Sequence, residues 1–263
     1  MTNDDRTVAR RPAEVVSRRH PLLAALETGP RAKGDLLDAV DCSSSTLDRA
    51  IRELETCHFL ERRDGSVRLT TAGRLALEEY CRSQRALESI TAASHVLQFA
   101  PPDAPLSMAV LDGATIHEPS SYAPNAPVER IADCMRDADH VWALGATERT
   151  PQFRRILSEQ TTDGDLSVEV VLTDDLLSFL LETSTDALER FLEVDAFEAA
   201  TTEEIPYGLA VLETPTKTYT FVTLTNEGDV QGVIENDSRA AYEWGRDVFR
   251  QVRSAATVLQ PPE

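Results

Sequence analysis

SSSTLDRAIRELE, residues Ser43–Glu55, is the stretch that decides the fold of the first part of this chain. It places Leu47, Ala50, Ile51 and Leu54 at the i, i+3, i+4 and i+7 positions of a helix with one apolar face. Ser43 stands where an N-cap hydroxyl is favoured. The stretch therefore predicts a capped, amphipathic helix from about Ser44 to Thr56.

The segments on either side of this helix predict a winged helix-turn-helix. A short helix with Leu36, Leu37 and Val40 on one face precedes it, separated by a turn of about three residues. Two extended segments follow, residues 59–62 and 67–70, and Asp-Gly lies between them, which is a strong hairpin signal. Helix, short turn, helix and hairpin is the order of a winged DNA-binding domain, which we place at residues 12–70.

The outward side of the predicted recognition helix and hairpin carries hydroxyl and guanidinium groups. A helix N-terminus favours phosphate oxygen, and Arg binds phosphate or the acceptor edge of guanine. The candidate DNA-binding residues are Ser44, Ser45, Thr46, Arg49, Arg52, Arg62, Arg63 and Arg68.

A simpler interpretation of these residues stays open. The hydroxyls could serve only as caps, and the arginines of the helix could pair with Asp48, Glu53 or Glu55 on a solvated face. Asp48 either reads a cytosine amino group or holds Arg52 in position, and the second role is favoured.

The charge of the chain is strongly acidic but unevenly distributed. There are 45 acidic and 26 basic residues, and only two of the basic residues are Lys. High acidity with little Lys resembles proteins of salt-in halophiles, although an acidic protein from a GC-rich genome is an alternative. Residues 1–100 hold 15 basic and 15 acidic residues, so the whole excess of negative charge lies beyond them. Double-stranded DNA is therefore an expected partner of the first hundred residues.

The rest of the chain is expected to hold a long helix and a second domain. Residues 1–11 are polar and predicted to be flexible, residues 71–100 form a long linker or dimerisation helix, and residues 101–105 are a Pro-rich linker. Residues 106–259 alternate strand and helix patterns, with a first strand at 106–111, helices at 151–159, 174–181 and 186–192, and a last helix at 238–259. The expected fold class is α+β, with a mixed α/β sheet in the second domain.

The long helix is a candidate dimer element, because operators are usually read by two-fold dimers. Its apolar positions 77, 80, 87, 90 and 97 make a partial heptad, so we expect a homodimer. Packing of the same residues within one chain is the alternative.

A loop after a predicted strand of the second domain is a candidate ligand site. In open α/β sheets ligands lie beyond the carboxyl ends of strands. Thr147, Arg149 and Thr150 offer hydroxyl and cationic groups for an anion, and Tyr207 is expected to line the same region. Alternatively, Thr150 only caps a helix and Arg149 pairs with a surface acid.

Several function classes are disfavoured by what the sequence does not contain. It has no run of about 20 apolar residues and no apolar N-terminal segment, so we expect a cytoplasmic protein with no membrane partner. The four cysteines form no C-x-x-C pair, so reduced thiols and no metal site are expected. We find no nucleotide-binding glycine motif and no hydrolase elbow, and therefore expect no cofactor and no catalysis.

Two segments resemble known regulators. Residues 35–80, with STLDRAIRELE followed by FLERRDGSVRLTTAG, are similar to archaeal winged-helix regulators of the MarR/ArsR-like and TrmB-like superfamily. Residues 205–256, with IPYGLAVLET and NDSRAAYEWG, resemble the effector domain of archaeal methanogenesis regulatory proteins and haloarchaeal regulators. The resemblance implies a phospholipase-D-like sheet with a sensing or assembly role. It implies no catalysis, because His117 and His140 each lack the Lys two residues later that such a catalytic site requires.

These observations predict a dimeric, DNA-binding transcription regulator that a small-molecule effector or a partner modulates through residues 106–259. A winged-helix module for protein–protein assembly, without direct DNA binding, is the alternative. The effector, the operator, and the choice between activation and repression do not follow from the sequence.

Overall fold

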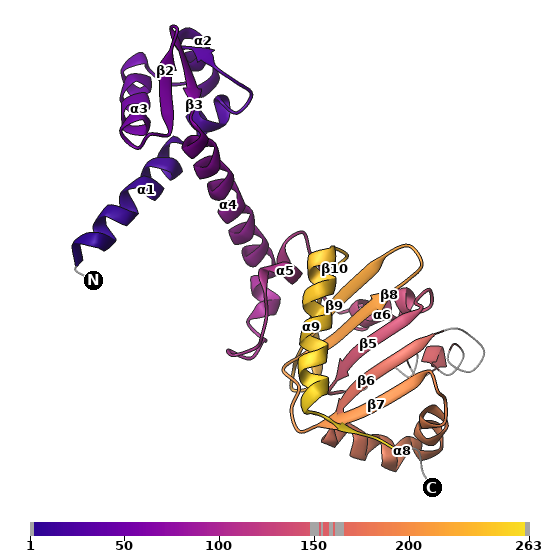
Figure 1. Ribbon diagram of the computed structural model, residues 1–263. Helices are drawn as coiled ribbons and strands as arrows, with labels where there is room; N and C mark the ends of the chain where they lie inside the picture. Colours follow the sequence, from indigo (N-terminus) through magenta and orange to yellow (C-terminus); the bar gives the residue numbers. More distant parts are fainter. Residues whose placement is uncertain (1–2, 148–152, 154, 158–159, 161–165, 261–263) are drawn as a thin grey trace. The chain divides into compact units, whose positions relative to one another are not determined.

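The computed structural model describes residues 3–147, 153, 155–157, 160 and 166–260, and for residues 3–11 and 187 it describes the backbone alone. The chain divides into two compact units, residues 1–87 and 88–263. Each unit is described by itself, and Figure 1 gives the labels of their elements.

The first unit is a winged helix-turn-helix, as the sequence predicts. Its elements are α1 (Asn3–Ala25), β1 (Arg31–Ala32), α2 (Lys33–Val40), α3 (Ser44–Thr56), β2 (Leu60–Arg63), β3 (Ser66–Leu69) and the first part of α4 (Thr71–Leu97). The strands form an antiparallel sheet in the order β1-β3-β2. Helix α1 begins at Asn3, within the segment 1–11, and the flexibility of that segment stays a prediction.

The core of the first unit is built from the predicted apolar face of α3. Leu47, Ala50, Ile51 and Leu54 are all buried, which confirms the helical periodicity. The wing turn has Asp64 at φ 52° and Gly65 at φ 78°, the two positive φ values that a tight hairpin turn requires.

Helix α4 starts against His58 and Phe59, the residues between α3 and β2, through a close backbone contact. The Thr70 hydroxyl accepts a hydrogen bond from the Gly73 N–H (3.0 Å) and donates one to the His58 carbonyl (2.6 Å). A Cβ on Gly73 would lie 2.0 Å from the carbonyl oxygen of Phe59, so only glycine fits there without a backbone shift. The L-T-x-A-G segment thus fixes where α4 begins.

The second unit is a mixed sheet covered by helices. Its helices are the end of α4, α5 (Met108–Leu111), α6 (Ala126–Met135), α8 (Asp174–Leu192) and α9 (Arg239–Ala255). Its strands are β4 (Thr115–His117), β5 (His140–Gly145), β6 (Ser167–Thr173), β7 (Phe197–Thr202), β8 (Gly208–Glu213), β9 (Thr218–Asn226), β10 (Asp229–Asn236) and β11 (Thr257–Val258). Among the described residues the strand order is β11-β7-β6-β5-β8-β9-β10-β4, with β5, β6 and β7 parallel and the other pairings antiparallel.

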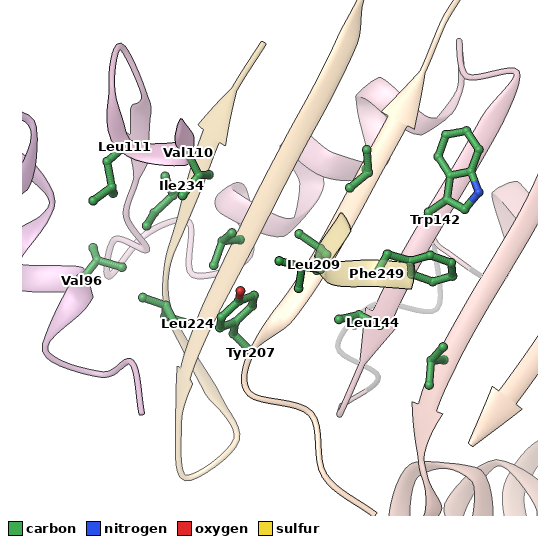
Figure 2. Packing of buried hydrophobic residues seen from close by; sticks show 14 of the residues in the cluster. Val96, Val110, Leu111, Trp142, Leu144, Tyr207, Leu209, Leu224, Ile234 and Phe249 are labelled. Atoms are coloured by element: carbon green, nitrogen blue, oxygen red, sulfur yellow. The ribbon is translucent and has the colours of Figure 1, made fainter. Parts of the chain in front are cut away.

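Both faces of this sheet are buried, and each has its own core. On β5, Val141 belongs to the core under α6 and α8, whereas Trp142 belongs to the core under α9, because successive side chains point to opposite faces. Figure 2 shows the second of these cores, in which Phe249 of α9 reaches the side chains around Leu209 and Leu144. The sheet is therefore the middle layer of three.

The end of α4 is part of the second unit. Val96 is completely buried in the core that Figure 2 shows, and a Cβ on Gly232 of β10 would lie 2.7 Å from its side chain. The two units therefore meet within α4, whereas the sequence placed the boundary in the Pro-rich segment 101–105.

Other details of the second unit also differ from the prediction. The expected strand at 106–111 is wrong, because Ser107 caps the short helix α5 by accepting from the Ala109 N–H (3.2 Å). The two helices expected at 174–181 and 186–192, in contrast, are both observed: they make up α8 and are separated by a kink at Ser184. Helix α9 ends at Ala255, and β4, β7 and β11 were not predicted. The expected helix at 151–159 lies largely outside the described residues.

Candidate nucleic-acid interface and ligand cavity

The N-terminus of α3 presents a group of hydroxyls. Ser43 caps the helix, with its Oγ accepting from the Thr46 N–H (3.2 Å) and lying 3.1 Å from Ser45 Oγ and 2.8 Å from Thr46 Oγ1. Ser44, Ser45 and Thr46 are all exposed. Ser43 thus caps the helix, and the exposed hydroxyls beside it stay available. Capping and phosphate contact, the two interpretations of these hydroxyls, are therefore compatible.

The two arginines of α3 point away from the core and have local partners. Arg49 donates through Nε to Glu53 (3.1 Å), and its side chain is 72% exposed. Arg52 donates to the backbone carbonyl of Asp48 (3.2 Å). Arg19 of α1 binds the same Glu53 (2.9 Å), and these hydrogen bonds, the one from Arg19 first, lower the pKa of that carboxyl. The arginines are therefore held in position by exposed, weak contacts that a stronger anion can replace.

The carboxylate of Asp48 has a different role from the one favoured by the sequence. It accepts from the ammonium of Lys33 on α2 (2.9 Å), a hydrogen bond that lowers the pKa of the Asp48 carboxyl. Arg52 contacts the backbone of Asp48 and not its side chain. Asp48 thus joins α2 to α3. Its partner Lys33, one of only two lysines, was not predicted from the sequence.

The wing carries three arginines, each beside a carboxylate. Arg62 lies 3.1 Å from Glu55, Arg63 lies 3.7 Å from Asp64, and Arg68 donates to Glu61 (2.6 Å). The pair between Arg62 and Glu55 links β2 to the last turns of α3. The wing and α3 are thereby joined by a pair of side chains, and all eight predicted DNA-binding residues lie within one unit.

The second unit contains an apolar cavity of about 300 Å³ between one face of the sheet and helices α6 and α8. Val141 and Ala143 of β5, Val168 of β6, and Leu176 and Leu188 of α8 are among its lining residues. At one end the cavity is bounded by Gly145, Thr147 and Gly208, where β5 ends and β8 begins. This is the strand-end position at which the sequence placed a ligand.

Two of the four predicted ligand residues line this cavity. They are Thr147 and Tyr207, and the other two, Arg149 and Thr150, lie outside the described residues. The hydroxyl of Tyr207 donates to the carbonyl of Pro105 (3.1 Å), and burial raises the pKa of its phenol. Tyr207 therefore lines only the end of the cavity, because its ring packs in the core under α9 against Trp244 and its hydroxyl is already engaged.

A polar network that the sequence did not reveal ties α6 to the edge of the sheet. Arg130 binds Glu235 of β10 through two hydrogen bonds (2.6 and 2.9 Å), and His117 of β4 lies 2.6 Å from the same carboxylate. Burial alone would raise the pKa of Glu235, but the hydrogen bonds from Arg130 and His117 outweigh it and lower that pKa. No local motif indicates this network, because Glu235 lies more than a hundred residues in sequence from both Arg130 and His117.

The described part of the chain has no disulfide, no cluster of metal-binding side chains and no membrane-spanning helix. All four cysteines are free thiols. In the described ranges, no group of three or more His, Cys, Asp and Glu side chains is arranged to hold a metal ion. Nor does any helix described for this chain have the length and apolar character needed to cross a membrane.

Two family models match the chain. The model described as "Methanogenesis regulatory protein FilR1, middle domain" matches residues 124–255, about half of the chain, and the model of the HVO_A0261 N-terminal domain matches residues 9–92. No curated protein matches significantly.

Solved structures show weaker likenesses. The archaeal chromatin protein TrmBL2 is 12% identical, with 94% of this chain and 98% of that chain covered at a TM-score of 0.44. The phospholipase D family member Nuc from Salmonella typhimurium is 9% identical, with 56% of this chain and 99% of that chain covered at 0.40. An IclR homolog from Microbacterium sp. strain HM58-2 is 17% identical, with 91% and 96% covered at 0.25. The family assignment rests on the two model matches.

Proposed function

Because the chain belongs to the family of the methanogenesis regulatory protein FilR1 middle domain, we propose that this transcription regulator binds specific double-stranded DNA sites through its winged helix. It does so as a homodimer, and a small-molecule effector that binds the second unit modulates it. It is a cytoplasmic regulator and not an enzyme.

One observation carries the DNA-binding part of the proposal. The exposed side of α3 has its hydroxyls at the positive end of the helix and its two arginines one and two turns later, while the opposite side is buried. Helix N-termini and Arg side chains supply phosphate and base contacts in winged helices. Arg62 and Arg68 of the wing extend the same set of cations.

Exchange of ion pairs is the physical event that binding would require. Each wing arginine and Arg49 has a carboxylate neighbour, and exposed pairs of this kind contribute only about 0–1 kcal/mol. A phosphate or a guanine edge that offers a bidentate, better-ordered contact can therefore replace the carboxylate at small cost.

The test is footprinting of the native promoter region with Arg49→Ala and Arg52→Ala in concentrated KCl. We expect each change to weaken protection at least about fivefold, because a good bidentate contact contributes about 1–3 kcal/mol. Arg239→Ala is the matched control, since Arg239 forms a similar exposed i,i+4 pair with Glu243 but lies in the second unit. Unchanged protection by both α3 variants would disprove the assignment and favour the assembly module.

The dimer is proposed to form along α4. Of the five apolar positions that suggested a heptad, Leu77, Tyr80 and Leu97 pack within the chain. Leu87 and Ile90 stay 54% and 39% exposed, three residues apart and so on one side of the helix. A second copy of α4 is the partner that would cover them.

Sedimentation velocity tests the dimer with the double variant Leu87→Gln and Ile90→Gln. It should sediment as a monomer, whereas Phe179→Gln, an equally exposed apolar residue on α8, should leave the dimer intact. A wild-type chain that is monomeric at micromolar concentration, or a variant that still dimerises, would contradict dimerisation through α4.

A further inference from the structure

The cavity of the second unit exists because small residues lie where large ones would fill the space. Ala143 of β5 and Ala210 of β8 are cross-strand partners, and both line the cavity. Gly145 and Gly208 continue this small-residue surface toward the end of the two strands. Ala143 and Ala210 are only half-buried, so this apolar space of about 300 Å³ is open enough to admit a ligand.

Helix α8 forms the opposite wall and bends over the cavity at Ser184. The backbone there has φ −156° and ψ 32°, and Ser184 itself lines the cavity. The hydroxyls on either side, of Thr183 and Thr185, donate to the carbonyls of Phe179 and Leu181 one turn earlier. Such side-chain to backbone hydrogen bonds bend helices, so Thr183 and Thr185 favour the kink of α8 at Ser184.

The described lining offers no counter-charge to a charged ligand. Among the described residues that line the cavity no side chain is ionisable at neutral pH, and its few polar groups include Thr147, Thr223 and Thr225. A buried carboxylate or phosphate would have no counter-charge there, and burying an unpaired charge is strongly unfavourable. A hydroxyl or carbonyl group, in contrast, can be satisfied by one threonine hydroxyl.

The volume limits the ligand's size. An apolar cavity of about 150 Å³ holds benzene, so a cavity of about 300 Å³ holds roughly twelve carbon atoms. We propose that the second unit binds an uncharged, predominantly apolar molecule of this size, such as a medium-chain alcohol, ketone or small terpenoid, with one polar group toward Thr147. This names the chemical class of the effector and so rests on the proposed function.

Binding is tested on the full chain in concentrated KCl with 1-naphthylamine, a neutral fluorescent probe of ten carbon atoms whose emission changes in apolar sites. We expect saturable fluorescence that 1-decanol displaces at a concentration at least tenfold lower than either decanoate or 1-butanol. Absence of probe binding, or equal displacement by decanoate, would overturn the assignment of an uncharged apolar ligand.

Space-filling variants locate the site. Ala143→Leu and Ala210→Leu should each weaken decanol binding at least tenfold, whereas Ala114→Leu, a half-buried alanine that does not line the cavity, should not. Circular dichroism checks that each variant folds. Should the leucine variants fail to fold, Val170→Ala, which enlarges the cavity, should shift the preference toward longer alcohols. Unchanged binding in every folded lining variant would overturn the location.

The same preparations separate this inference from the proposed function. A chain that binds decanol but protects no promoter refutes DNA binding and leaves the ligand site standing. A chain that protects its promoter but binds no neutral probe refutes the ligand class alone. If decanol binds and leaves protection unchanged at saturation, the cavity is a ligand site but the ligand is not an effector.

Discussion

Replacement of Gly73 by alanine should destabilise the winged helix, although helix propensity alone predicts the opposite. Gly73 lies in the first turn of α4, where Gly→Ala would ordinarily stabilise by about 0.5–1 kcal/mol. The new Cβ would lie 2.0 Å from the Phe59 carbonyl oxygen, more than 1 Å inside contact distance, and that oxygen belongs to the backbone. Overpacking of this severity costs about 3 kcal/mol, so the expected net loss is about 2 kcal/mol.

The location of the tryptophans makes the assay selective. Trp142 and Trp244 both lie in the second unit, so tryptophan fluorescence reports unfolding of that unit, and helical circular dichroism reports both. For a unit of about 87 residues, a loss of 2 kcal/mol lowers the midpoint by roughly 10 °C. The Gly73→Ala chain should therefore show an earlier transition by circular dichroism and an unchanged one by fluorescence.

Gly34→Ala is the matched control. Gly34 lies in the first turn of α2, and a Cβ there would meet nothing within 4 Å. This substitution should leave the early transition unchanged or raise it by a few degrees, because only helix propensity acts. The reasoning about the Phe59 carbonyl is refuted if Gly73→Ala is as stable as Gly34→Ala.

Three further outcomes follow from contacts within the second unit. Lowering the pH should destabilise the second unit below about pH 4.5, because the folded-state pKa of Glu235 is depressed. The stabilisation by this carboxylate is complete above its unfolded-state pKa and is lost as the pH falls through its folded-state pKa. Glu235→Gln should therefore flatten this part of the plot of urea midpoint against pH. Asn236→Ala should cost about 2 kcal/mol in urea unfolding followed by tryptophan fluorescence, because its amide donates to two backbone carbonyls at the end of α5 (3.1 and 2.9 Å); an unchanged midpoint would contradict this. Gly232→Ala should cost about 1–3 kcal/mol in the same assay, because its Cβ would lie 2.7 Å from Val96, and Val96→Ala should partly rescue it.

The parts that could be predicted from sequence are those fixed by local chemistry. The buried face of α3 follows from helical periodicity, its cap from Ser43, and the wing from Asp64-Gly65, and all of these are observed. The apolar run at 106–111 was ambiguous because so few residues fit a strand or a helix equally well, and the Ser107 cap decided it. Strand β7 was not predicted, because its sequence FEAATT is rich in small residues and shows little alternation of apolar and polar side chains.

The parts that could not be predicted depend on residues far apart in the chain. Glycine at the start of a helix looks unfavourable until the Phe59 carbonyl is placed beside it. The partner of Asp48 lies in the preceding helix, and the cavity is lined from six strands and from helices α6 and α8. The anion suggested by Arg149 and Thr150 remains a prediction, while the described cavity lining favours a neutral molecule.

The pairing of each wing arginine with a carboxylate has a consequence for how the protein would search a genome. Non-specific attraction to DNA grows with the number of phosphates that a protein neutralises, and a surface whose cations are already matched attracts bulk DNA only weakly. Little of the protein would then be held on the many competing sites. Occupancy of an operator would depend on contacts good enough to displace Glu53, Glu55 and Glu61, so these acids would act as a threshold for sequence recognition.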